Sequence, residues 1–280
     1  MSRTLLRTRN VLKAWALLFG LCAVLGILPL LTGNYRLLSI FLFCALLLVG
    51  AGYFYADRIA LGMVGARELQ RGEVPALHST VERLAALAGI PKPRLYVLTD
   101  GYPRVLAAGR GPRGSAIAVS RGFLAGSPPA ELEGVLAHEI AHIRDRDVLI
   151  QTAVSVLAGA IIELSRLGGF LQRTLLFGLG PLAAALVHLF LSSGREFLAD
   201  EAAAELCGSP HGLADALIRL EQASEMVEFQ ASAATEPLYI LNPFAEEGLA
   251  ALFVTHPPVG ERVSRLRELD PAWREKLRAA

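Results

Sequence analysis

The sequence predicts a mainly helical integral membrane protein with a small β-sheet, and three observations support this fold class. The 280 residues are 53% hydrophobic and only 19% charged, which is too apolar for a protein with a fully solvated surface. Four long apolar runs alternate with charged segments. Two short stretches rich in β-forming residues lie between prolines and glycines. We therefore expect two membrane-associated helical pairs joined to an α+β unit.

The first two apolar runs predict an N-terminal transmembrane hairpin. Residues 14–32 and 37–56 contain no charged side chain, and at about 1.5 Å per residue each can cross a hydrocarbon core of about 30 Å. Four basic residues precede the first run and one separates the two, so the positive-inside rule places the N-terminus, and residue 57 onward, in the cytoplasm. A signal peptide is the alternative for the first run, although the run exceeds the usual apolar region of about 7 to 15 residues.

The composition of residues 57–133 is typical of a soluble domain. Residues 74–90 have apolar side chains at helical spacing. The stretches "RLYVLTD" and "SAIAVS" predict two strands with a loop over residues 100–114 between them. The segment "SPPAELEGVLAHEIAH" predicts a helix that has Ser127 as its N-cap.

The third and fourth apolar runs predict a second helical pair. Residues 148–162 are short for a span and residues 174–193 are long enough. Arg166 and Arg173 lie between them and would have to be translocated against the positive-inside bias. We predict that both runs span, with a membrane-dipping or core-buried hairpin as the alternative. The predicted organisation is a transmembrane hairpin over 1–56, the first part of a cytoplasmic domain over 57–147, the apolar pair over 148–193 and the second part of the domain over 194–280. Within this last part, Gly208 predicts a helix stop and residues 211–228 predict an amphipathic helix.

A histidine motif on the predicted helix indicates a metal site. His138 and His142 are four residues apart, so they project from one helix face and their imidazoles can bind one Zn²⁺ together. Glu139 lies beside them and can accept a proton from a metal-bound water. A helix with two unrelated histidines is the alternative. The motif favours a zincin-like α+β hydrolase with one Zn²⁺ per chain as cofactor.

Hydrolytic zinc needs a third protein ligand and an open position for water. The three cysteines lie far apart without a Cys-x-x-Cys pair, so a carboxylate is the natural candidate. Glu196 and Asp200 are spaced i, i+4 in "GREFLADEAAAEL", which would let one bind zinc while the other accepts an N–H from a ligand imidazole. Spacing does not choose between Glu196 and Glu201. An exposed acidic helix face that includes Glu205 is the alternative.

Three segments, "AHEIAHIRDRD", "REFLADEAAAEL" and "THPPVGER", resemble the HtpX-type membrane zinc metalloproteases, gluzincins related to the type I CAAX prenyl endopeptidases. The resemblance covers nearly the whole chain. It implies His138, His142 and Glu196 as zinc ligands, Glu139 as general base and Asp200 as the carboxylate that supports a ligand imidazole. It also implies an endopeptidase in the cytoplasmic (inner) membrane of a prokaryote, with membrane proteins as substrates and a role in their quality control and stress response.

The resemblance extends to an edge strand that would receive the substrate. Its equivalent is "RVLAAG", residues 104–109, which implies substrate contacts by Val105, Leu106 and Ala107. Arg104 stands where the family usually has Asn, and Leu106 where it has Phe. Because an extended peptide pairs through backbone groups, we expect the strand to persist with altered side-chain preferences.

The remaining histidines and one arginine are secondary candidates. His256 could donate to the oxyanion of the tetrahedral intermediate, or could simply begin a helix at the Pro-rich turn. Arg262 could assist it, but a solvated helix residue is the preferred interpretation. His188, inside an apolar run, is expected to be neutral and hydrogen-bonded between helices. His78 and His211 are expected at the surface or at helix caps.

Other classes of function receive less support from the sequence. A net charge of +1 offers no basic face to nucleic acid. A CAAX-type processing protease would need more spanning helices than the four apolar runs, a silent membrane scaffold would have no chemical need for Glu139, and a transporter would carry more ionisable groups in its spans. The expected partners are the lipid bilayer and peptide or membrane-protein substrates, while the oligomeric state stays open.

Overall fold

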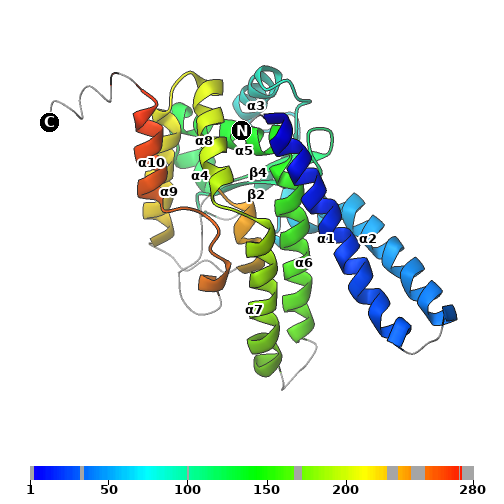
Figure 1. Cartoon of the computed structure of the whole chain (residues 1–280). Helices are drawn as coiled ribbons and strands as arrows, with labels where there is room; N and C mark the ends of the chain where they lie inside the picture. The colour runs from blue at the N-terminus through cyan, green and yellow to red at the C-terminus, as the bar shows by residue number, and fades with distance from the viewer. Residues whose placement is uncertain are drawn as a thin grey trace.

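The computed structural model describes residues 3–31, 35–99, 101–166, 172–225, 233–240, 250–270 and 272. It is mainly helical with one small sheet, as the sequence predicts (Figure 1). Two helical pairs extend from the same side of an α/β body (Figure 1). The first pair is α1 (Arg3–Leu31) with α2 (Tyr35–Met63), and the second is α6 (Asp147–Arg166) with α7 (Gln172–Phe190).

The first pair is longer than the predicted apolar runs. The extra turns pack against the body, because Asn10 of α1 and Ala60 and Leu61 of α2 are buried. The predicted boundary at residue 56 therefore falls inside a helix.

Among the described residues, no single helix is both long and apolar enough to cross a membrane. One pair meets these criteria together by length and composition, residues 176–190 with residues 194–207, bent by 51° at the break between them.

The sheet is mixed and has the order β1-β2-β4-β3. β2 and β4 are parallel, whereas β1 pairs with β2, and β3 with β4, in antiparallel register. The strands are β1 (Arg67–Glu68), β2 (Arg94–Leu98), β3 (Val105–Gly109) and β4 (Ser115–Ser120).

The edge strand β3 corrects the loop that local propensity predicts over residues 100–114. All five of its residues are buried, and it packs against α5 (Pro129–Asp145) and α6. Ala, Ala and Gly at its end are weak strand formers, so tertiary packing decides its conformation. The strand that the family resemblance implied at this place is present.

The helices before and within the body follow their local signals except at one cap. α3 (Pro75–Leu87) matches the predicted helix, and Gly89 with φ 68 lies just beyond its end. Ser127 is not the N-cap of α5, because it ends α4 (Arg121–Gly126). Pro128 takes the cap position without a side-chain hydrogen bond, because its ring has no acceptor atom. Pro129, at the first helical position, has no backbone N–H that needs a partner.

α5 lies at the centre of the body, between the sheet and the C-terminal helices (Figure 1). α8 (Gly194–Cys207) ends at Gly208 with φ 70, where the sequence predicts a helix stop. The predicted helix over 211–228 is α9 (His211–Glu225), and its last three positions lie outside the described residues. The remaining elements are the 3₁₀ turns η2 (Ala233–Leu238) and η3 (Ala250–Phe253) and the helix α10 (Val259–Glu268).

Close approach between α5 and α9 depends on Gly134, and we predict that Gly134→Ala destabilises the protein. An added Cβ would lie 2.5 Å from the backbone nitrogen of Leu213. The overlap should cost about 1–3 kcal/mol, more than the gain of about 1 kcal/mol from alanine's higher helix propensity. Thermal unfolding in detergent measures this. Gly260→Ala on α10, where a Cβ meets nothing within 4 Å, is the matched control and should not lower the melting temperature. Equal stability of wild type and Gly134→Ala would contradict the proposed contact.

Candidate metal centre

The two motif histidines lie on one face of α5 and point toward the same place. The Nε2 atoms of His138 and His142 are 3.1 Å apart, with their rings nearly perpendicular at 86°. Both side chains are buried. Two imidazole nitrogens at this separation are close enough to bind one ion.

Glu196 of α8 completes a group of three donors. Its Oε2 lies 3.4 Å from His138 Nε2, and its Oε1 lies 3.5 Å from His142 Nε2. In a tetrahedral zinc site with bonds of about 2.0–2.1 Å, neighbouring donors are about 3.3 Å apart. Both carboxylate oxygens are buried and accept no hydrogen bond among the described residues, so the cluster fits a cation. Glu201, which spacing left as an alternative, is exposed.

A second carboxylate orients each imidazole from its far side. His138 Nδ1 lies 2.9 Å from Asp200 Oδ1, and His142 Nδ1 lies 3.2 Å from Asp147 Oδ2. An N–H donated from Nδ1 leaves the Nε2 lone pair free for a metal. Asn10 of α1 in turn donates from Nδ2 to Asp147 Oδ1. The sequence analysis missed Asp147, because its only signal is a position just beyond the predicted metal helix.

Arg262 supports Asp200, and the expectation that it is solvated is wrong. The side chain is fully buried and donates to both Asp200 oxygens, from Nε at 2.8 Å and from Nη2 at 2.7 Å. Burial of Asp200 opposes its ionisation, but the Arg262 charge outweighs this and lowers the pKa of Asp200. The position of Arg262 on a predicted amphipathic helix could not reveal this role, because most arginines on such helices face water.

The electrostatics of the cluster suit a dication. Burial works to lower the pKa of His142, but Glu196 and Asp147 outweigh it and raise that pKa to about 10. Burial likewise opposes ionisation of Glu196, yet His256 and His142 hold its pKa well below the usual range. The same carboxylates that attract a proton to His142 would also attract a metal ion, and the bound ion would displace that proton.

Glu139 occupies a different electrostatic position. It is buried beside the two histidines, and its Oε1 has no hydrogen-bond partner within the residues that the structure describes. Burial is the main effect and raises the pKa of its carboxyl. A carboxyl with a raised pKa can both accept a proton and return it near neutral pH.

His256 lies inside the cluster. Its side chain is buried, with Nδ1 3.3 Å from Glu196 Oε2 and Nε2 3.7 Å from Glu236 Oε1. Neither ring nitrogen forms a hydrogen bond among the described residues. Glu236 instead accepts from the backbone nitrogen and hydroxyl of Thr255, at 3.0 Å and 2.8 Å. The η2 segment and the turn before α10 are thus joined next to the metal ligands.

The edge of β3 is also covered by the segment that follows η2. Leu106 forms an isolated antiparallel bridge with Tyr239, and the nitrogen of Ile240 donates to Val105 O at 3.4 Å. Arg104, where the family resemblance expects Asn, donates to the Tyr239 hydroxyl at 3.4 Å.

The other histidines lie away from the cluster. His188 Nε2 lies 2.9 Å from Leu252 O of η3, so it is hydrogen-bonded between helical segments as expected. His78 Nε2 lies 3.3 Å from Gln70 O. His211 begins α9 and lies 2.8 Å from Asp270 Oδ2. Both positions match the expected surface or cap sites.

Comparison with known proteins agrees with this geometry. Residues 71–270 match the model of peptidase family M48. A protease HtpX homolog of Pelotomaculum thermopropionicum is 38% identical over 278 residues, which cover 93% of this chain and 99% of that protein. A protease HtpX homolog of Pyrococcus abyssi is 42% identical over 237 residues, which cover 78% of this chain and 81% of that protein. The crystal structure of S. mikatae Ste24p has a TM-score of 0.48 and 19% identity, covering 93% of this chain and 66% of that one.

The family match spans most of the chain, and the two HtpX relatives cover more than three quarters of it. These findings confirm the predicted HtpX-type resemblance and the predicted metalloendopeptidase activity. The chain therefore belongs to peptidase family M48 and is a metalloprotease.

Proposed function

We propose that the chain is a zinc endopeptidase, anchored in the cytoplasmic membrane, that cleaves membrane proteins or their cytoplasmic segments as part of membrane-protein quality control. The observation that carries the proposal is the cluster of His138, His142 and Glu196. Its donor atoms all lie within 4.8 Å of one another, and its nitrogen and oxygen donors are those that zinc prefers in hydrolytic sites.

The residues of the cluster divide the chemistry between them. Zinc held by the two histidines and Glu196 would supply Lewis acidity and an activated water. Glu139 accepts the proton of the attacking water and returns it to the leaving amine. His256, whose buried ring nitrogens have no hydrogen-bond partner in the described part of the chain, donates to the developing oxyanion. Asp200 and Asp147 hold the ligand imidazoles in the required orientation.

The substrate is proposed to add as an extended strand at the outer edge of β3, on the side away from β4. Val105, Leu106 and Ala107 would then provide backbone groups for pairing, as in other cases of strand addition. Because Tyr239 and Ile240 contact this edge, their segment has to move aside when a peptide binds.

Membrane insertion is proposed for both helical pairs. They extend in similar directions from the body (Figure 1), and each exposes large apolar side chains, including Phe19 and Phe43 on the first pair and Phe177 and Leu189 on the second. Such surfaces are stable when lipid covers them. The basic residues ahead of residue 14 favour a cytoplasmic N-terminus, which places the body in the cytoplasm as well.

Replacing Glu139 by Gln should stop cleavage while zinc stays bound. The amide has nearly the same shape but cannot accept the proton, so the rate of hydrolysis of a model membrane protein should fall by about 10²–10⁴-fold. Zinc per chain is determined on the same samples. Full cleavage by a zinc-loaded Glu139→Gln protein would refute the general-base role, and zinc in neither protein would refute the site.

Replacing Asp147 by Asn should weaken zinc binding by about 10–100-fold, because His142 loses its oriented carboxylate partner. Asp215→Asn is the matched control, since that side chain is exposed and pairs only with Arg267 at 3.3 Å among the described residues. Competition with a chromogenic chelator measures the affinity. The same affinity in both variants would mean that Asp147 does not support the metal.

The proposed topology predicts which side of the membrane each segment faces. In a chain whose native cysteines are replaced, Ala86→Cys on exposed α3 should react with a membrane-impermeant maleimide only after cells are lysed. Gly33→Cys, between the two N-terminal apolar runs, should react in cells with a permeabilised outer membrane but an intact inner one. The opposite pattern would invert the orientation, and labelling of both residues before lysis would argue against insertion.

A further inference from the structure

A cavity of about 560 Å³ lies where α1, α2, the β3–β4 turn and the end of α5 meet. Tyr53 and residues 88–91 line part of it, and its lining includes no acidic residue among those described. We name it the arginine pocket, after the arginines that line it: Arg7, Arg110, Arg113, Arg144 and Arg146.

The positive charge of this pocket is mostly uncompensated. Asp145 is the one carboxylate in contact with these arginines among the described residues. Arg144 donates to it at 3.1 Å and 2.8 Å, and Arg7 Nε lies 3.4 Å from it. The guanidinium groups of Arg110, Arg113 and Arg146 pair with no described carboxylate. Like charges gathered around one cavity repel each other, so an anion in the cavity would stabilise the arrangement.

Arg110 also has a donor that lacks an acceptor. Its Nε atom is buried and forms no hydrogen bond among the described residues. The Arg110 guanidinium lies 5.1 Å and 5.6 Å from the ring centroids of Phe54 and Tyr53, which hold it in place by cation–π contacts. Buried donors without partners are uncommon in native proteins. The presence of one here points to a ligand with acceptor oxygens.

The β3–β4 turn presents its two arginines on a rigid frame. Gly109 has φ 151, and a Cβ there would lie 2.4 Å from Gly114 O, so the turn closes tightly. The Gly109 nitrogen also donates to Thr152 Oγ1 of α6 at 2.9 Å. Arg110 and Arg113 therefore extend from a turn that is tied to the second helical pair.

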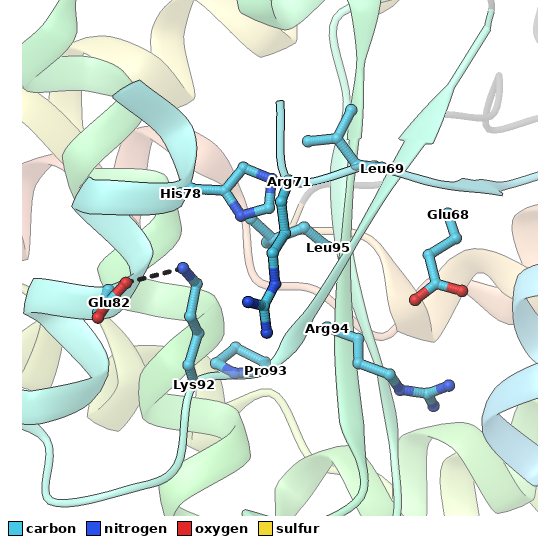
Figure 2. A pocket seen from close by; sticks show the side chains of 9 residues that line it. All are labelled: Glu68, Leu69, Arg71, His78, Glu82, Lys92, Pro93, Arg94 and Leu95. Atoms are coloured by element: carbon cyan, nitrogen blue, oxygen red, sulfur yellow. Dashed lines mark hydrogen bonds and ion pairs between the residues drawn. The ribbon is translucent and has the colours of Figure 1, made fainter. Parts of the chain in front are cut away.

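A second cavity of similar size shows what a compensated site looks like. It has a volume of about 580 Å³ and lies between β2 and α3 (Figure 2). Acidic residues share its lining, and Lys92 donates to Glu82 at 2.9 Å (Figure 2). Arg94 pairs with Asp57. Because its positive charges are largely balanced by carboxylates, an anion would stabilise this cavity less than the arginine pocket.

We propose that the arginine pocket binds the phosphate group of an anionic phospholipid. The guanidinium fork matches phosphate oxygens in pairs, and basic pockets at the cytoplasmic ends of membrane helices suit anionic headgroups. Arg7 on α1 and Tyr53 on α2 place the pocket where the first helical pair meets the body. The lipid assignment rests on the proposed membrane insertion and is independent of peptidase activity.

Lipid binding to the full chain in a neutral detergent tests the proposal. Phosphatidylglycerol should raise the melting temperature, whereas phosphatidylcholine at the same mole fraction should not. The double variant Arg110→Gln with Arg146→Gln should bind phosphatidylglycerol about tenfold or more weakly, because each lost charge-assisted contact accounts for about that factor. The double variant Arg110→Lys with Arg146→Lys keeps the charges. Its affinity for phosphatidylglycerol should lie between that of the wild type and that of the glutamine variant.

The matched control removes two positive charges from the second cavity, as Arg71→Gln with Lys92→Gln, and should respond to phosphatidylglycerol like the wild type. Equal loss in both glutamine variants, or an equal response to the two lipids, would overturn the proposal. If inorganic phosphate alone reproduced the full shift, the ligand would be free phosphate and the lipid assignment would be wrong. Cleavage measured in parallel separates this outcome from failure of the proposed protease function.

Discussion

The burial of ionisable side chains on α5 is the constraint on which the rest of the body depends. His138, Glu139 and His142 are all nearly inaccessible to water, and isolated buried charges are strongly destabilising. The two histidines therefore need partners supplied by other elements. The neighbouring helices are arranged so that they supply these partners.

The partners come from widely separated parts of the chain. α8 contributes Glu196 and Asp200, α10 contributes Arg262 to neutralise Asp200, and the first residue of α6 contributes Asp147. A buried ion pair stabilises little by itself, but removal of one member leaves an uncompensated charge. The network thus specifies how α6, α8 and α10 dock on the metal helix, and a metal ion would complete it from the inside.

The sequence predicts the part of this site that depends on local geometry. His138 and His142 follow from helical spacing, and the stop at Gly208 follows from its tolerance of positive φ. The choice of Glu196 over Glu201 needs tertiary structure or a family resemblance, because both lie on the same helix and only their burial distinguishes them. Arg262 was misassigned for the same reason.

Other features escaped prediction because the relevant contacts cross a break in regular structure. The family resemblance indicated β3, whereas its own residues are weak strand formers that α5 and α6 force into an extended conformation. Asp147 lies beyond the end of α5, and nothing in the flanking sequence indicates that its side chain contacts His142. Single-element patterns cannot report a contact of this kind, since it depends on the angle between two helices.

That angle is set at Arg146, which has φ 64 between α5 and α6. A non-glycine residue in this conformation carries some strain, which the surrounding contacts must offset. On one side of the turn, Asp147 holds His142 and accepts from Asn10 of α1. On the other, Asp145 accepts from Arg144 and lies beside Arg7, also of α1. The first helix therefore contacts both sides of the turn, so its position relative to the body bears directly on the orientation of a metal ligand. A displacement of α1, which we propose to lie in the membrane, would therefore alter the contacts of Asp147 and with them the orientation of His142.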